Sequence, residues 1–130
     1  MTSLLVTAAF CGALAIMKEA RGEPLVGQVA IVFVIRNRMK HDFWPDTVCD
    51  VVREPGQFTF SWTYREDSRD LKNAFMIWNA VNPDVITDPT LGSCFYHSTI
   101  RRANKAFFRT LKPTVKIGNH QFYACPDGKY

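Results

Sequence analysis

The chain has 130 residues and a mass of 14.8 kDa, enough for one domain with a hydrophobic core and too little for two ordinary domains. Hydrophobic residues make up 47% and charged residues 22%, which excludes a disordered, collagen-like or coiled-coil chain. A net charge of +4 and a pI near 9.0 favour an anionic partner such as nucleic acid, anionic lipid or a cell-wall polymer. We therefore expect a single domain over residues 1–130.

An apolar run from Leu4 to Met17 lies near the start of the chain. No basic residue precedes it, unlike a secretory signal peptide, and it is shorter than the roughly 20 residues of a membrane span. We predict a buried helix that is capped by Ser3 and ends near Ala20, with Gly22 just beyond. No later stretch is apolar for long enough to cross a bilayer, so we expect no stable membrane insertion.

The second apolar element, residues 25–39, has an ambiguous pattern. Its many β-branched residues favour a strand, whereas its length and the spacing of Val29, Val32 and Phe33 favour a helix buried on most sides. We predict a helix. Residues 41–64 are rich in Pro, Gly, Asp and Thr, which indicates irregular chain with one short helical turn around residues 49–53.

The last part of the chain changes from helical to strand patterns. Residues 69–81 have apolar side chains at spacings of four and three, which predicts an amphipathic helix. Residues 93–99 and 114–123 are predicted strands, the second interrupted at Gly118–Asn119, with a basic connection over residues 101–112. Helices followed by strands predict an α+β fold.

The cysteines stand far apart, with no CxxC pair and no His at ligand spacing, at Cys11, Cys49, Cys94 and Cys125. Buried free thiols are the preferred interpretation, and a disulfide framework stays open because the count is even. His97 and His120 have no spaced acidic partner, so we expect neither a metal site nor a cofactor. No Ser-His-Asp or Cys-His arrangement can be assembled with any specificity.

Glu19 lies at the end of the first predicted helix. A carboxyl that emerges from an apolar helix into a cleft is partly desolvated, which raises its pKa and lets it act as a general acid. An ordinary solvated Glu at a helix end is the alternative, and physics alone favours it.

Four segments resemble the signature blocks of the bacterial cell-wall hydrolases typified by the spore cortex-lytic enzyme SleB. They match in order and spacing: EARGEPLVGQVAIVFVIRNRM (19–39), PDTVCDVVREPGQFTFSW (45–62), DPTLGSCFYH (88–97) and TVKIGNHQFY (114–123). Several separated blocks that agree in order are a stronger signal than one short motif. The resemblance covers most of the chain from Glu19 to Tyr123.

The resemblance implies a lysozyme-like α+β domain, with N-terminal helices and a small antiparallel β element. It implies cleavage of peptidoglycan glycan strands between N-acetylmuramic acid and N-acetylglucosamine, as a lytic transglycosylase in which Glu19 is first acid and then base. A water-using muramidase stays open, with Glu23, Asp46 or Glu54 as helpers. A non-catalytic glycan-binding protein of the same fold is the further alternative.

Several other residues are expected at the substrate. Glu23 is four residues from Glu19, but Gly22 and Pro24 interrupt the helix, which favours a structural role such as pairing with Arg21 or Arg36. Gln57 can offer an amide to sugar groups, and the aromatic and imidazole rings of the two strands can stack on sugars. The expected substrate-binding residues are Glu23, Gln57, Phe58, Tyr96, His97, His120 and Tyr123.

The expected partners and location of the protein depend on its charge and on the apparent lack of a wall-binding module. Nucleic-acid binding is weakly supported, because the basic residues are scattered and no binding motif accompanies them. The basic connection of residues 101–109 either holds an anionic polymer or is a solvated loop. We expect a monomeric bare catalytic domain, with a bacteriophage endolysin as the hypothesis for its origin. Such a lysin accumulates in the host cytoplasm and then reaches the wall; otherwise the protein acts at the cell envelope.

Overall fold

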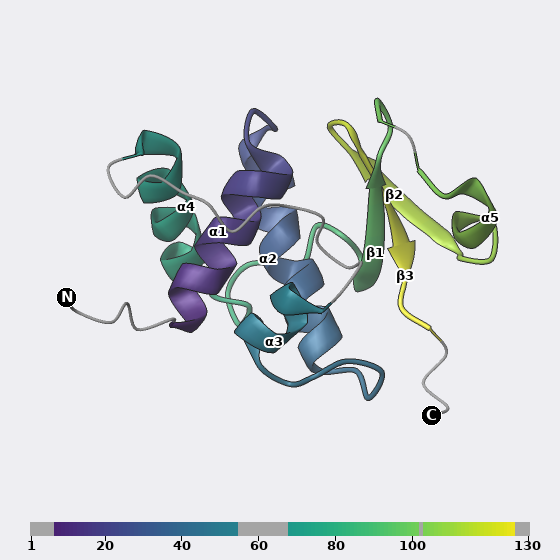
Figure 1. Cartoon of the computed structure of the whole chain (residues 1–130), viewed down its shortest axis with the longest axis horizontal. Coiled ribbons are helices and arrows are strands. Elements are labelled where there is room, and N and C mark those ends of the chain that lie inside the picture. The colour runs from purple at the N-terminus through teal and green to yellow at the C-terminus, as the bar shows by residue number, and fades with distance from the viewer. Residues whose placement is uncertain (1–6, 55–67, 102, 127–130) are drawn as a thin grey trace.

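The computed structural model describes residues 7–54, 68–101 and 103–126. In these residues the helices α1 to α4 precede a small sheet and lie to one side of it, with α5 on the other side, and the predicted α+β class is confirmed (Figure 1). The helices are α1 (Ala8–Ala20), α2 (Leu25–Met39), α3 (Val48–Arg53), α4 (Arg69–Ala80) and α5 (Lys105–Phe108). The strands are β1 (Ser93–Ser98), β2 (Pro113–Ile117) and β3 (His120–Ala124).

Helix α1 is the buried N-terminal helix that the apolar run predicts. It begins at Ala8, because the Thr7 hydroxyl accepts a hydrogen bond of 3.1 Å from the Phe10 N–H and so caps the first turn. The predicted cap at Ser3 is therefore wrong, and Ser3 lies outside the described residues. The helix ends at Ala20, followed by Gly22 at φ +85°, a left-handed conformation that glycine adopts without strain.

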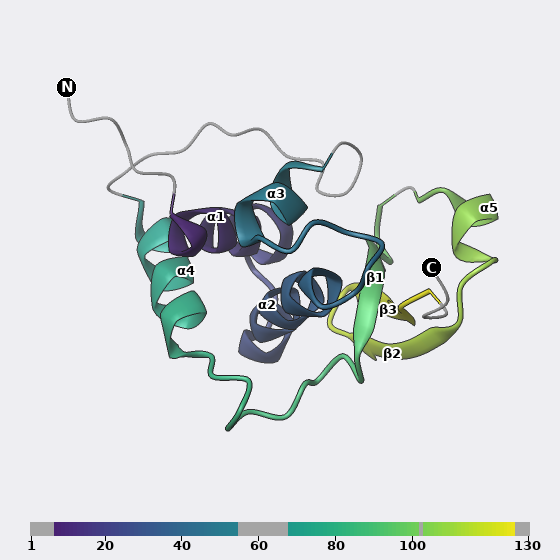
Figure 2. The same ribbon diagram turned by 90° about the horizontal axis from the view of Figure 1, so that it is seen from below.

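Helix α2 lies between the helices α1 and α3 and the strand β1, as the view from below shows (Figure 2). Its consecutive residues from Ala30 to Ile35 are all buried, because neighbouring elements cover it on several sides. This explains why its sequence shows little helical periodicity while the helix prediction is confirmed. None of the described helices combines the length and apolar composition needed to span a membrane.

Helices α1 and α4 pack closely because a glycine removes the side chain at their contact. A methyl group placed on Gly12 would run into the indole ring of Trp78. Leu71, Ala74 and Trp78 lie on one face of α4 and are buried against the core, which confirms the predicted amphipathic helix. The short helical turn expected around residues 49–53 is confirmed as α3.

The sheet is antiparallel with strand order β1-β3-β2. Residues 114–123 form two strands rather than one interrupted strand, because the chain reverses at Gly118–Asn119, where Gly118 has φ +56°. The basic connection between β1 and β2 contains α5, which the sequence analysis did not predict. Ala30, Val34, Ile117 and Phe122 pack α2 against the β2–β3 hairpin.

All four cysteines form disulfides, so the expectation of buried free thiols is wrong. Cys11 of α1 bonds to Cys49 of α3, and Cys94 of β1 bonds to Cys125 just after β3. The partners are 38 and 31 residues apart in sequence, and only the fold brings their Cα atoms to 5.2 and 4.6 Å. One bond therefore ties α1 to α3, and the other ties β1 to the end of β3.

Candidate active site

A cleft of about 680 Å³ opens between the end of α1 and the sheet. Its walls come from α1, α2, β1, the β1–α5 connection and the β2–β3 turn. The residues on which its chemistry depends are Glu19, Arg38, Tyr96, Arg101, Asn119 and His120.

Glu19, the predicted acid, lies in this cleft in the last turn of α1. Its Oε1 accepts a hydrogen bond of 2.7 Å from the hydroxyl of Tyr96. Burial raises the pKa of Glu19, although the Tyr96 hydrogen bond and the charges of Arg101 and Arg38 act in the opposite direction. A carboxyl whose pKa is raised stays protonated to a higher pH, which is the property a general acid needs.

Tyr96 reaches Glu19 because side chains alternate between the two faces of a strand. It pairs with Phe122 across β1 and β3, and its ring packs against those of Phe122 and His120, with centroids 5.6 and 5.0 Å away. All three rings share the face of the sheet that is turned toward α2. Burial and the neighbouring Glu19 raise the pKa of Tyr96 well above its usual value, so the hydroxyl remains a donor.

Arg38 is a buried cation beside Glu19, and the sequence analysis missed it. Only 3% of its surface is exposed, its Nε donates a 2.6 Å hydrogen bond to the Cys94 carbonyl, and its guanidinium lies over the rings of Trp44 and Phe95. Burial lowers the pKa of Arg38 to about 10, so it is still charged at neutral pH. The helix carries two charged residues in its last turn, Arg36 and Arg38, and the sequence pattern does not show which of them is buried.

Glu23 follows α1 and is fixed by the β2–β3 turn. Its two carboxylate oxygens accept hydrogen bonds from the backbone N–H (2.8 Å) and the side-chain amide (3.2 Å) of Asn119. The suggested pairing with Arg21 or Arg36 is wrong. Arg21 forms an exposed ion pair of 3.8 Å with Asp70, and Arg36 lies over the Trp78 ring.

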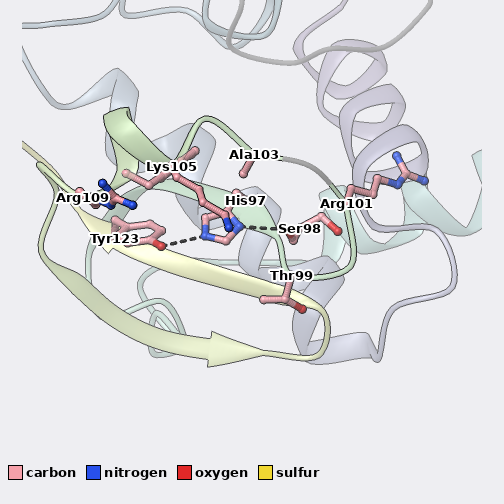
Figure 3. A pocket seen from close by; sticks show the side chains of 9 residues that line it. His97, Ser98, Thr99, Arg101, Ala103, Lys105, Arg109 and Tyr123 are labelled. Carbon is pink, nitrogen blue, oxygen red and sulfur yellow. Dashed lines mark hydrogen bonds between the residues drawn. The ribbon is translucent and has the colours of Figure 1, made fainter.

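His97 and Tyr123 point to the other face of the sheet and line a second pocket beside the cleft (Figure 3). His97 Nε2 and the Tyr123 hydroxyl are 2.8 Å apart, and the two rings are stacked with centroids 5.5 Å apart. The sequence analysis named the strand rings together as stacking surfaces for sugars. In the structure Tyr96 and His120 line the cleft alone, Tyr123 lines the second pocket alone, and His97 lines both.

His120 lies at the cleft with 6% of its surface exposed. Among the described residues its buried Nδ1 has no hydrogen-bond partner. Burial lowers the pKa of His120, so the ring is neutral at neutral pH. A neutral, unpartnered ring nitrogen can exchange a hydrogen bond with a substrate group.

The remaining predicted residues are not part of the described cleft. Gln57 and Phe58 lie outside the described residues. Asp46 is exposed, Glu54 is half-buried, and neither lines the cleft. The described residues contain no cluster of three or more His, Cys, Asp or Glu side chains that could hold a metal ion.

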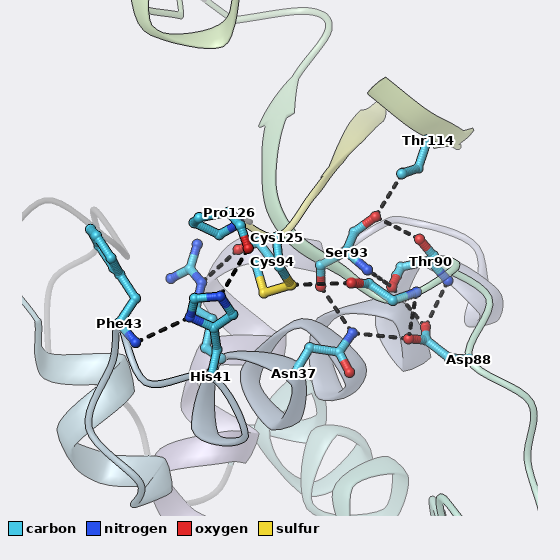
Figure 4. Close-up of a disulfide and its surroundings, with 12 residues drawn as sticks. Asn37, His41, Phe43, Asp88, Thr90, Ser93, Cys94, Thr114, Cys125 and Pro126 are labelled. Atoms are coloured by element: carbon cyan, nitrogen blue, oxygen red, sulfur yellow. Dashed lines mark hydrogen bonds between the residues drawn. A yellow bond between two sulfur atoms is a disulfide. The ribbon is translucent and has the colours of Figure 1, made fainter. Parts of the chain in front are cut away.

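A hydrogen-bond network holds the start of β1 against α2 (Figure 4). The Asp88 carboxylate accepts hydrogen bonds from Asn37 Nδ2 (2.9 Å), from the Thr90 N–H and hydroxyl (both 2.7 Å) and from the Gly92 N–H (3.0 Å). Asn37 also donates to the Ser93 carbonyl at 2.9 Å. The network fixes the strand that brings Tyr96 to Glu19.

The chain is similar in sequence to a known protein family and to curated proteins. A family model described as Cell Wall Hydrolase matches residues 22–123. Curated spore cortex-lytic enzymes from Bacillus cereus and Oceanobacillus iheyensis are 35% and 34% identical over 111 residues, 83% of this chain. The matched region spans 40% and 38% of those relatives, so the chain corresponds to less than half of their length.

Two solved structures have the same fold. The catalytic domain of SleB from Bacillus anthracis, described as a germination-specific lytic transglycosylase, matches with a TM-score of 0.69 and 30% identity over 94% of this chain and 99% of that one. The catalytic domain of Bacillus cereus SleB matches with a TM-score of 0.66 and 32% identity, over 89% and 88%. These matches confirm the resemblance carried by the four sequence blocks. The chain belongs to the cell wall hydrolase family.

Proposed function

We propose that the protein is a cell-wall lytic enzyme that cleaves peptidoglycan glycan strands between N-acetylmuramic acid and N-acetylglucosamine, as a lytic transglycosylase. The observation that carries this proposal is a half-buried glutamate with a raised pKa, held by a tyrosine in a cleft between helices and sheet. The family match begins at Gly22, so the role of Glu19 rests on this geometry.

In the first step Glu19 acts as the acid. Tyr96 holds Oε1, and the proton on Oε2 passes to the oxygen that joins muramic acid C1 to the next sugar. The bond from C1 to that oxygen breaks, the leaving sugar departs with a hydroxyl, and C1 gains oxocarbenium character. The carboxylate that forms is stabilised by the Tyr96 hydroxyl and by the charges of Arg38 and Arg101.

In the second step the same carboxylate acts as the base. It removes the proton from the C6 hydroxyl of the muramic residue, and O6 forms a bond to C1. The product has a 1,6-anhydro end, no water is consumed, and Glu19 is again protonated. One carboxyl therefore serves where retaining and inverting hydrolases use a pair.

The other acid at the cleft supports a mechanism with one carboxyl. Glu23 is the second described carboxylate that lines the cleft, and both of its oxygens are bound by Asn119. A water-using muramidase needs a free carboxylate opposite the acid, and Glu23 is already engaged in fixing the β2–β3 turn. We therefore favour the transglycosylase and give Glu23 a positioning role.

We also propose that His120, His97 and Tyr123 contact the substrate. His120 lines the cleft, and His97 lines both the cleft and the neighbouring pocket. Flat rings beside polar groups suit sugar rings, which present apolar faces and hydroxyl edges. Gln57 and Phe58 stay predictions from the sequence.

Digestion of purified peptidoglycan by the protein and by Glu19→Gln, followed by mass spectrometry of the released muropeptides, tests the proposal. We expect 1,6-anhydromuramic ends from the protein and a loss of roughly 10²- to 10⁴-fold in rate with Glu19→Gln, since the amide cannot donate or accept the proton. Asp46→Asn, which removes an exposed carboxylate, is the matched control. Reducing muramic ends would instead establish a muramidase, and no release by either protein would favour a glycan-binding protein.

We propose that the protein acts as a monomer at the cell envelope. Its two disulfides are of the kind that persist in oxidising compartments outside the cytoplasm. A bacteriophage lysin made in the host cytoplasm would then complete these bonds on its way to the wall. Protein purified in the reduced state and then oxidised tests this route: activity should rise on oxidation, and equal activity of the two forms would contradict it.

A further inference from the structure

The second pocket, of about 540 Å³, lies beside the cleft and is lined by residues of β1, α5, β3 and the segment between β1 and α5 (Figure 3). Its floor is rigid. The His97 ring is held by the Tyr123 hydroxyl at 2.8 Å and by the Ser98 carbonyl at 2.9 Å, and it packs against Phe108 with centroids 4.7 Å apart. A floor fixed on three sides is prepared to receive a ligand without first being ordered.

The rim of this pocket is basic. Residues 89–126 contain six Lys and Arg and no Asp or Glu, and three of the six, Arg101, Lys105 and Arg109, line the pocket. No carboxylate of the described residues forms an ion pair with any of these three. Three cations around one concave site, none of them in an ion pair with a described carboxylate, favour an anionic ligand.

The pocket is continuous with the cleft that holds Glu19. His97, Ser98 and Arg101 line both cavities. Arg101 is near enough to Glu19 for its charge to lower the pKa of that carboxyl. A molecule bound with its glycosidic bond at Glu19 can therefore extend one of its groups into the pocket.

We propose that this pocket binds the carboxylate-bearing peptide stem of the muramic residue that is cleaved, an inference that rests on the proposed function. An intact glycan strand with its lactyl groups in amide linkage is uncharged, and the stem attached to muramic acid supplies the carboxylates closest to the scissile bond. The stem leaves the sugar ring sideways, and the pocket lies to the side of the cleft. Lys105 and Arg109 determine substrate preference and take no part in the proton transfers.

The test compares native sacculi with sacculi whose carboxylates have been converted to amides by carbodiimide and ammonia. Phosphate-bearing wall polymers are removed from both beforehand. The double variant Lys105→Ala/Arg109→Ala is compared with Lys112→Ala/Lys116→Ala, which removes two exposed charges from the same part of the molecule outside the pocket.

We expect the protein to cleave native sacculi with a KM about fivefold or more below that on amidated sacculi, at similar kcat. Lys105→Ala/Arg109→Ala should raise the KM on native sacculi to the amidated level, whereas the control variant should keep the preference. The preference should shrink as salt is added, because exposed charges are screened. Equal KM values on the two substrates, or equal effects of the two double variants, would overturn the proposal.

Binding gives a readout that does not depend on cleavage. Glu19→Gln protein is sedimented with the same two kinds of sacculi, and we expect a several-fold preference for the native kind that is lost in the Lys105→Ala/Arg109→Ala background. That preference would support the stem pocket even if the cleavage products contradicted the transglycosylase. A third sample of sacculi keeps its phosphate polymers, and retention of the protein by that sample alone would overturn the stem assignment in favour of a wall polymer.

Discussion

The helical part of the molecule and the sheet part differ in charge, core and role. Residues 1–88 carry nine Lys and Arg against eleven Asp and Glu, whereas residues 89–126 carry six Lys and Arg and no acid. Most of the core lies among the helices, while the sheet shares a small cluster with α2. The helices supply Glu19, the proposed acid, and the buried Arg38 near it. The sheet supplies the Tyr96 hydroxyl and the strand rings, and the segment between β1 and β2 supplies the cations that line the second pocket.

Under the proposed function, proton transfer belongs to the helical part and recognition of the substrate to the basic part. A desolvated carboxyl needs a well-packed surrounding, which α1 and α2 provide. An anionic ligand needs accessible cations, which the β1–α5 connection provides. The two parts meet where Tyr96 donates to Glu19 and Arg38 donates to the Cys94 carbonyl.

One disulfide lies among the helices and the other at the sheet, so removing one or the other destabilises one part at a time. Replacing either pair with alanine should lower the free energy of unfolding by about 2–4 kcal/mol, measured by urea denaturation. Replacing Cys94 and Cys125 should also lower kcat/KM, because the Cys94 carbonyl holds Arg38 beside Glu19. Replacing Cys11 and Cys49, which join α1 to α3, is the control. Equal losses of activity at a temperature where both variants are folded would contradict the distinction.

Gly12 tests the packing of the helical part alone. Gly12→Ala places a methyl group against the Trp78 ring, which should lower the free energy of unfolding by about 1–3 kcal/mol. In a Trp78→Leu background the same change should cost less, because the smaller side chain leaves room. Denaturation of the four proteins measures this coupling, and an unchanged stability of Gly12→Ala would contradict the close approach of α1 and α4.

Tyr96→Phe breaks the contact between the two parts. Loss of the hydrogen bond should lower kcat/KM by about tenfold and raise the pKa of Glu19 further, because the hydroxyl stabilises the carboxylate. Activity requires the protonated acid and falls as pH rises through this pKa, so the alkaline limb of the pH–rate profile should move to higher pH. Tyr123→Phe, whose hydroxyl contacts His97, should not move the limb. A shift to lower pH would contradict the assignment.

Glu19→Gln tests whether the catalytic carboxyl weakens the fold. The pKa of Glu19 is raised in the folded state by burial, so folding favours its protonated form. Its contribution is fully present below the unfolded pKa and is lost as pH rises through the folded value. We expect Glu19→Gln to have a higher Tm than the original protein at neutral pH and a similar Tm below about pH 4. Asp46→Asn controls for loss of a negative charge, and a lower Tm of Glu19→Gln at neutral pH would contradict the prediction.

Local sequence patterns predicted much of the fold. The helices over residues 25–39 and 69–81 and the strand near residues 93–99 follow from apolar length, spacing and turn residues, all of which act within a few residues. The reversal at Gly118–Asn119 was visible as an interruption, but its geometry was not. The pairing of cysteines 38 and 31 residues apart depends on contacts that no local pattern reports.

The candidate site shows the same limit. Glu19 was predicted as the acid from two observations, its position at the end of an apolar helix and the resemblance of the four blocks. The residues that surround it could be identified only from the fold. Tyr96 faces Glu19 while His97 faces the neighbouring pocket, because the register of β1 with β3 sets which residues turn toward α2.

The sequence by itself determined the composition, most of the helices and strands and the family, and it predicted Glu19 as the acid. Only the tertiary structure decided that Arg38 is buried beside it, that Glu23 is bound by Asn119, and that the basic residues near α5 surround a pocket. The physical reason is that propensity and periodicity act between near neighbours, whereas burial, charge coupling and cavity shape are set by groups distant along the chain.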